Sequence, residues 1–208
     1  PVLMAELEKR LAEKSDDTVA AEVLAALCQA TPGFEARAAE LYQQLVDRSP
    51  DQLALRELLA DSYASAHELQ KAVDLYRGLI EANPAKRFDY TGKLAAALAA
   101  SGDRKGAADA INALVTADVA TDPQVLARVG GMLAELQLYE ESAVHYRKAV
   151  ELAKDGELKQ AMQVSLARVL LALGHSEEVA ALCREVIGQP ASEALKTQAE
   201  EVLRQLPG

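Results

Sequence analysis

Apolar side chains recur along the whole chain at the three- to four-residue spacing of amphipathic α-helices. The clearest example is the stretch 53–84, in which two such helices are separated by a short turn. Pro84 ends this unit, because proline cannot continue a helix and disfavours helical angles in the residue before it. Neither helix can bury its apolar stripe alone, so the unit needs similar units beside it. The pattern therefore predicts an array of stacked helical hairpins.

The same pattern divides the chain into about twelve helices joined by short turns, with no strand candidate. We expect one domain over residues 1–208, with the second helix of a truncated repeat at 1–16 and a solvating helix at 191–208. Five repeats lie between them, at 17–50, 51–84, 85–121, 122–155 and 156–190. Because the first helix has no partner before it, we also expect more protein upstream of Pro1.

The repeat length can be checked at two places in each hairpin. The small residue that opens the inner face of each second helix recurs at steps of 34, 35, 35 and 37 residues: Ala38, Ala72, Ala107, Ser142 and Val179. An apolar–small pair in each first helix keeps nearly the same step: Ala25-Ala26, Leu59-Ala60, Leu94-Ala95, Val129-Gly130 and Leu166-Ala167. A period of this size is typical of helix-hairpin solenoids.

These residues resemble the tetratricopeptide repeat (TPR). That family has a bulky residue three positions after the apolar–small pair, matched here by Tyr63, Leu98, Leu133 and Leu170, whereas Gln29 stands at this site in the first repeat. Its second helix has a small–x3–aromatic–x2–apolar pattern, which fits Ala38/Tyr42/Leu45, Ala72/Tyr76/Leu79 and Ser142/Tyr146/Ala149. A turn glycine is matched by Gly33, Gly102 and Gly174, but the family's early tryptophan is absent. The resemblance implies an all-α, right-handed superhelical solenoid of antiparallel helix hairpins that binds proteins and is not an enzyme.

Composition narrows the range of partners. The chain carries 22 Lys and Arg against 32 Asp and Glu, a formal net charge of −10, and its basic residues are scattered singly. Such a chain repels phosphate backbones, so we expect no nucleic-acid partner. Its apolar runs are too short to cross a bilayer. The composition suits a bacterial assembly factor, and the sequence leaves the cytoplasm and the periplasm both open as its location.

No set of residues predicts catalysis, a cofactor or a metal site. His67, His145 and His175 fall in three different repeats without the pair spacing of a helical metal site, and we expect exposed turn histidines. Gly130-Gly131 lacks the preceding strand and following lysine of a phosphate loop. Cys28 and Cys183 lie far apart in the array, so two reduced, partly buried thiols are expected rather than a disulfide.

In TPR proteins one face of each first helix lines the concave surface, and the resemblance places a partner-binding groove there. The groove residues that it implies are Ala54, Glu57, Asp61, Asp89, Gly92, Ala96, Gln124, Ala127, Gly131, Glu135, Val164, Arg168 and Leu171, with Ala20, Val23 and Leu27 from the first repeat. This groove would be apolar at both ends and acidic in the middle, with Arg168 as its one cation. It would repel an acidic tail and accept a basic or amphipathic helical segment.

Gly131 requires a reason of its own, because Gly130 already fills the small packing site of its helix. The close approach of another backbone in the groove is one reason; tight packing of the inner faces against each other, or drift, are the alternatives. The protein as a whole has two interpretations. It is a scaffold that holds a peptide or partner helix, or a spacer or oligomerisation arm of a longer protein that self-associates through exposed ends.

Overall fold

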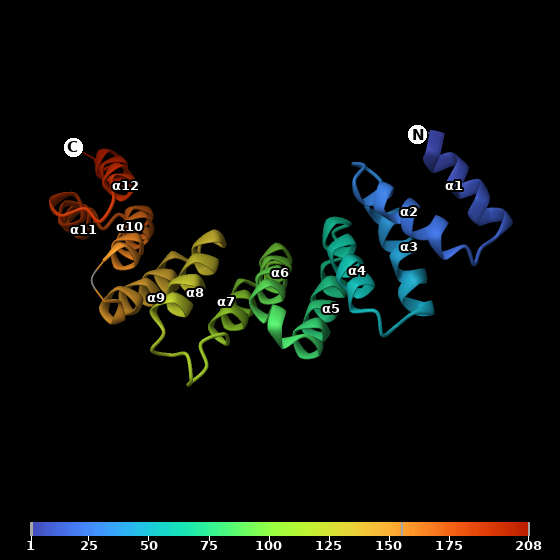
Figure 1. Ribbon diagram of the computed structural model, residues 1–208, viewed down its shortest axis with the longest axis horizontal. Coiled ribbons are helices and arrows are strands. Elements are labelled where there is room, and N and C mark those ends of the chain that lie inside the picture. Colours follow the sequence, from blue (N-terminus) through green and yellow to red (C-terminus); the bar gives the residue numbers. More distant parts are fainter. Residues whose placement is uncertain (1, 155, 208) are drawn as a thin grey trace. The chain divides into compact units, whose positions relative to one another are not determined.

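The computed structural model describes residues 2–154 and 156–207. Over these residues the fold is all-α, as predicted, with twelve α-helices, one short 3-10 helix and no β-strand. The helices, labelled in Figure 1, are α1 Val2–Glu13, α2 Thr18–Gln29, α3 Glu35–Arg48, α4 Leu53–Ser65, α5 Leu69–Ala82, η1 Pro84–Lys86, α6 Arg87–Ala100, α7 Arg104–Asn112, α8 Pro123–Glu135, α9 Tyr139–Leu152, α10 Glu157–Ala172, α11 Ser176–Gly188 and α12 Glu193–Arg204.

The chain forms two compact units, Pro1–Ala107 and Ala108–Gly208, whose boundary lies within α7. In the first unit each helix from α1 to α6 packs against the next along the chain. In the second unit the same order holds from α8 to α12, and α12 also covers α10. Within each unit, helices that are adjacent in sequence are therefore neighbours in space, which is the packing that a helical solenoid requires.

Most hairpins share one turn structure. The backbone N–H of Glu68 donates to the carbonyl oxygen of Tyr63 at 2.9 Å, which satisfies a carbonyl that the end of α4 leaves unpaired. An equivalent hydrogen bond closes the next three turns, from a backbone N–H to the carbonyl oxygen five residues earlier. The donors and acceptors are Asp103 to Leu98, Leu138 to Leu133 and His175 to Leu170, each at 2.9 Å. The residue before each donor has a positive φ: it is glycine in two turns, but His67 and Gln137 in the others.

The turn of the first hairpin is one residue longer. Gly33, with φ of +90°, lies five residues after Cys28, whereas the equivalent residue of the later turns lies four after the bulky residue. Leu24 and Ala25 are fully buried and Ala26 is exposed. The apolar–small pair of α2 is therefore Leu24-Ala25, and the predicted pair Ala25-Ala26 is wrong by one residue. Cys28, not Gln29, occupies the bulky site.

Close helix packing depends on small residues at the predicted sites. Ser142 Oγ donates to the carbonyl oxygen of Gly130 at 2.7 Å inside the core between α9 and α8. A Cβ atom at position 130 would lie 2.9 Å from the ring of Tyr146. Glycine is thus the residue that lets these two helices approach.

The two cysteines are free and buried, Cys28 in the first unit and Cys183 in the second. Burial raises the pKa of both thiols. A thiol of raised pKa carries little of the reactive thiolate near neutral pH, so both side chains act as small core residues.

An ion pair joins α1 to α3 in the same way as another ion pair joins α9 to α11. Arg37 of α3 donates to both carboxylate oxygens of Glu8 on α1, at 2.9 and 2.8 Å. Arg147 of α9 makes the same two-bond contact with Glu178 of α11, at 3.1 and 2.8 Å. Since α9 and α11 are second helices of successive hairpins, α1 lies beside α3 as a second helix does.

Candidate partner-binding surface

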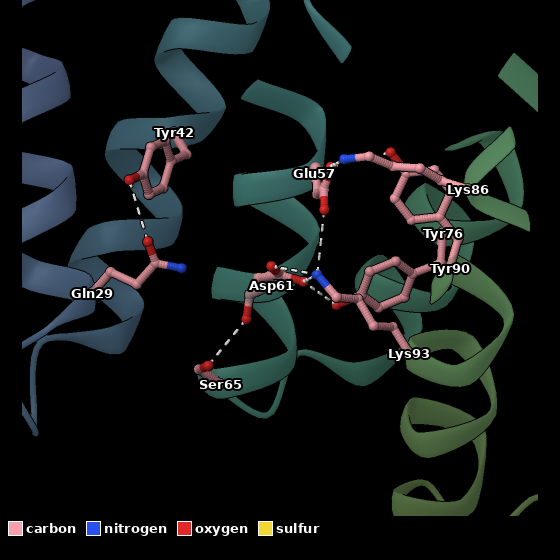
Figure 2. A network of polar contacts seen from close by, with 9 residues as sticks. All are labelled: Gln29, Tyr42, Glu57, Asp61, Ser65, Tyr76, Lys86, Tyr90 and Lys93. Atoms are coloured by element: carbon pink, nitrogen blue, oxygen red, sulfur yellow. Dashed lines mark hydrogen bonds and ion pairs between the residues drawn. The ribbon is translucent and has the colours of Figure 1, made fainter. Parts of the chain in front are cut away.

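We call the face of the first helices on which the predicted groove residues lie the inner face. In the first unit this face carries a set of polar contacts that joins α4 to the helices after it (Figure 2). Glu57 and Asp61 lie one turn apart on α4, so their carboxylates project from the same face. Glu57 Oε2 accepts hydrogen bonds from Lys86 Nζ at 3.0 Å and from the Tyr90 hydroxyl at 3.1 Å. Both donors come from the start of the next hairpin, at the end of η1 and in α6.

Asp61 is bound more tightly still. Its two carboxylate oxygens lie 2.8 and 2.7 Å from Lys93 Nζ on α6, and Oδ1 also accepts from the Tyr76 hydroxyl on α5 at 2.7 Å. Lys93 Nζ is in addition 3.6 Å from Glu57 Oε1. We call these residues the Lys93 cluster: Glu57, Asp61, Tyr76, Lys86, Tyr90 and Lys93.

The electrostatics of the cluster follow from these contacts. Burial alone would raise the pKa of Glu57, but the hydrogen bonds from Lys86 and Tyr90 outweigh it and hold that pKa below its usual value. The bond to Glu57 raises the pKa of Lys86, and burial together with Asp61 raises that of Tyr76. The Glu57 carboxylate is therefore ionised near neutral pH, and each of the two acidic side chains lies beside a lysine ammonium group.

The expectation of an acidic centre needs correction as a result. Glu57 and Asp61 are matched by Lys86 and Lys93, so the middle of this face carries no net charge from the cluster. Arg168 is also not the one cation of the inner faces, because Lys93 is half-exposed beside Asp61.

The other predicted groove residues of the first unit are accessible. Ala54, Asp89 and Ala96 are exposed, and Gly92 is half-buried. The exception is the first repeat, where Ala20 is only 1% exposed. When the sequence of α2 is aligned to the repeat with Leu24-Ala25 as its apolar–small pair, the positions equivalent to Ala54, Glu57 and Asp61 are Val19, Glu22 and Ala26. All three are exposed.

In the second unit the predicted residues divide into two groups. Gln124, Glu135 and Arg168 are exposed, and Ala127, Gly131 and Leu171 are half-buried. Val164, in contrast, is 2% exposed and belongs to the apolar core, so its side chain is not open to a partner and the prediction for it is corrected. Arg168 Nη2 reaches Gln198 Oε1 of α12 at 3.5 Å.

The structure also supplies a reason for Gly131. A Cβ atom at this position would lie 3.2 Å from the hydroxyl oxygen of Tyr146. The close approach thus comes from a side chain of the same unit. A partner's backbone is not required to explain the glycine.

Four members of the cluster were missed as site residues from the sequence: Tyr76, Lys86, Tyr90 and Lys93. A signal for one of them existed. Lys93 follows Asp61 by 32 residues, nearly one repeat, and opposite charges at that separation fall on adjacent first helices.

His145 differs from the exposed histidine that was expected. It is half-buried on α9, and its Nε2 lies 2.7 Å from Asn112 Oδ1 at the end of α7. Burial, with a smaller contribution from Lys148, lowers its pKa. Neutral imidazole with its Nε2–H donated to the amide oxygen suits a structural role.

The described residues contain no group of three His, Cys, Asp or Glu side chains placed to hold a metal ion. Among the helices of residues 2–154 and 156–207, none has both the length and the apolar character needed to span a membrane.

Comparison with solved structures supports the same fold. A structure described as "MamA MSR-1 C2" is 25% identical with a TM-score of 0.50, over 72% of this chain and 84% of that one. A structure described as "MamA RS-1 ArsTM double mutant" is 15% identical with a TM-score of 0.53, over 91% of this chain and 96% of that one. Naa15/Naa10 bound to HypK-THB is 17% identical with a TM-score of 0.57, over 96% of this chain and 31% of that chain. No family model matches the chain, and no curated protein matches it.

The helical hairpins, their repeat length and the likenesses to the three structures above define the class of protein: the chain is a solenoid of helical hairpins, the fold that the resemblance to the tetratricopeptide repeat implies. The resemblance that the sequence suggested is confirmed at the level of the fold.

Proposed function

We propose that this chain is a non-catalytic scaffold that holds a protein or peptide segment on the inner faces of its first helices. In the first unit the surface is centred on α4 and α6. The observation that carries the proposal is the combination, on one face, of exposed small residues at Ala54 and Ala96 with the fixed polar groups of the Lys93 cluster.

The small residues leave room for a partner's side chains, and the cluster offers polar anchoring points. Because its carboxylates are already matched by ammonium groups, the cluster does not select a basic segment by charge. Lys86, whose side chain is 50% exposed, can donate to a backbone carbonyl or a polar side chain of the partner. An amphipathic helix or an extended segment with polar residues at its centre therefore fits this face better than a strongly basic one.

One structural neighbour agrees with such a role. Naa15/Naa10 bound to HypK-THB is a protein assembly, and this chain matches about a third of the neighbour's length. At 17% identity the likeness concerns the fold, and it supports the proposal only by showing this fold within a complex of proteins.

The test is binding to a captured partner by the intact chain and by arginine variants of the inner face. Ala54→Arg and Ala96→Arg should abolish binding while the helical circular dichroism stays unchanged. Ala181→Arg, at an exposed position of the second helix α11, is the matched control. Ala127→Arg tests the inner face of the second unit in the same way, and it should also abolish binding. Normal binding by Ala54→Arg and Ala96→Arg would contradict the proposal.

The alternative role, a spacer or an arm that self-associates through exposed ends, has one supporting observation. Val2, Leu3 and Val19, at the α1–α2 end of the first unit, are exposed apolar side chains. Light scattering of the chain over a range of concentrations distinguishes the two roles, because a monomer at every concentration counts against self-association.

A further inference from the structure

A polar cavity lies in the last hairpin, between the first half of α10 and the end of α11. Its volume is about 490 Å³, which is within the range of small-molecule sites. The residues that line it include Gly156, Lys159 and Gln163 from the α10 side, and Arg184, Glu185 and Gly188 from α11. None of these residues belongs to the predicted groove, so this α10–α11 cavity is separate from the inner face.

Gln163 gives the first indication of a ligand. Its side chain is buried, with only 3% of the residue exposed, and it lines the cavity. Its amide group makes no hydrogen bond with any residue that the structure describes. Buried polar groups are almost always hydrogen-bonded, and one without a protein partner points to a bound molecule. A molecule in the cavity can supply that partner.

Packing alone does not require a glutamine here. The equivalent position of the preceding three hairpins holds Arg56, Thr91 and Leu126. Leu126 is 1% exposed, so an apolar side chain fills the position in a core of the same unit. Arg56 reaches across to α5, where its Nη2 lies 2.9 Å from the place that a Cβ atom of Gly78 would take. In the last hairpin the corresponding space is the cavity.

Gln160 holds the rim of the cavity in place. Its amide nitrogen donates to the carbonyl oxygen of Gln189 at 2.7 Å, and its amide oxygen accepts from the backbone N–H of Ala191 at 2.7 Å. These two bonds connect α10 to the segment that follows α11. The cavity is therefore formed before a ligand arrives, which reduces the ordering that binding requires.

The charges around the cavity indicate what it accepts. Arg184 and Glu185 are exposed, neither forms an ion pair with another described residue, and Lys159 adds a second cation. Gly156 has no side chain to cap α10, and an uncapped helix N-terminus favours an anion. A carboxylate matches the two cations, and an N–H donor on the same ligand matches Glu185.

We propose that the α10–α11 cavity binds a ligand with the chemistry of an amino acid. Its carboxylate accepts from Arg184 and from the amide nitrogen of Gln163, and its N–H group donates to Glu185. A free amino acid and the C-terminal residue of a peptide both carry this pair of groups. The site goes beyond the proposed scaffold role, and either can fail without the other.

The test is an NMR titration of the isotope-labelled intact chain with three compounds. Glycine represents the free amino acid, N-acetylglycine represents the end of a peptide, and N-acetylglycinamide lacks the carboxylate. The backbone amides of Gly156 and Gly188 and the side-chain amide of Gln163 report on the cavity. At about 10 mM, which nearly fills a millimolar site, glycine or N-acetylglycine should shift these signals and N-acetylglycinamide should not. The carboxylate that binds more tightly identifies the source of the ligand.

Two variants test the named contacts. Arg184→Gln should weaken binding of the carboxylate roughly tenfold, through the loss of one charge-assisted hydrogen bond. Its matched control is Lys148→Gln, which removes an exposed cation of α9 that does not line the cavity and should bind normally. Gln163→Leu copies the residue found at Leu126, so it should stay folded by circular dichroism and lose the response. A packing role for Gln163 would leave the response intact.

The absence of shifts with both carboxylates, or equal shifts with N-acetylglycinamide, would overturn the proposal. Equal affinity for inorganic phosphate would also overturn it, by showing a site for anions of any kind. Equal weakening by Lys148→Gln would reduce the effect to general charge attraction. Arg184 is exposed, so its variant decides the question even if Gln163→Leu unfolds.

Discussion

The ammonium nitrogen of Lys93 lies 2.8 and 2.7 Å from the two carboxylate oxygens of Asp61, and this contact joins two first helices that are one repeat apart. The hydroxyl of Tyr76, from the helix between them, donates to the same carboxylate. Packing of apolar stripes would permit some sliding between hairpins. The Lys93 cluster adds directional bonds between α4 and α6 to that apolar packing.

Lys93→Met should destabilise the α4–α6 contact, because it leaves two carboxylates one turn apart with only Lys86 as a counter-charge. The side chains of Lys93 and Asp61 are 37% and 30% exposed, so solvent screening reduces the effect to about 1 kcal/mol or less. Hydrogen exchange of α4 and α6 amides measures it. In a double-mutant cycle with Asp61→Asn the two changes should be non-additive. Simple additivity would show that the contact contributes nothing to stability.

Adjacent glycines of α8 should respond differently to alanine. Gly130→Ala places a methyl group 2.9 Å from the Tyr146 ring and should cost about 1–3 kcal/mol through overpacking. Gly131→Ala meets the end of the same side chain at 3.2 Å, and alanine recovers up to about 1 kcal/mol of helix propensity, so it should be close to neutral. Thermal unfolding of the two variants provides the comparison. Equal losses would mean that Tyr146 does not set the difference.

Glycine at the two strained turns should stabilise the protein. His67 and Gln137 have φ of 59° and 58°, a region that costs an L-residue roughly 1–2 kcal/mol. Part of that gain is offset by the greater freedom of glycine in the unfolded chain. His67→Gly and Gln137→Gly should each therefore raise the free energy of unfolding by about 0.5–1 kcal/mol. Gly102→Ala, in the equivalent turn, is the control and should be destabilising. A loss of stability in both glycine variants would refute the assignment of strain.

The architecture could be predicted because it depends on repetition. A single weak motif says little, but five degenerate copies at nearly constant spacing indicate one packing scheme, and the structure follows it. The error at Ala25-Ala26 came from a local feature that periodicity averages away. One additional residue in the turn before Gly33 changes the offset of α2 without changing its helical pattern, so either pair satisfied the sequence equally well.

The candidate surface was less predictable, for a physical reason. Whether Glu57 and Asp61 act as free acids depends on side chains that lie about one repeat away in sequence, and the repeat pattern does not record how far a lysine reaches. Val164 illustrates the opposite limit. The pattern placed it on the inner face, whereas the structure buries it in the apolar core of the second unit.

Cys28 and Cys183 are both enclosed in apolar cores, one in each compact unit. Each thiol can meet a dissolved reagent only when the helices around it separate. A thiol-labelling time course would thus give two rates, one that reports the opening of residues 1–107 through Cys28 and one that reports the opening of residues 108–208 through Cys183. The chain carries a built-in reporter of whether its two halves come apart together or independently.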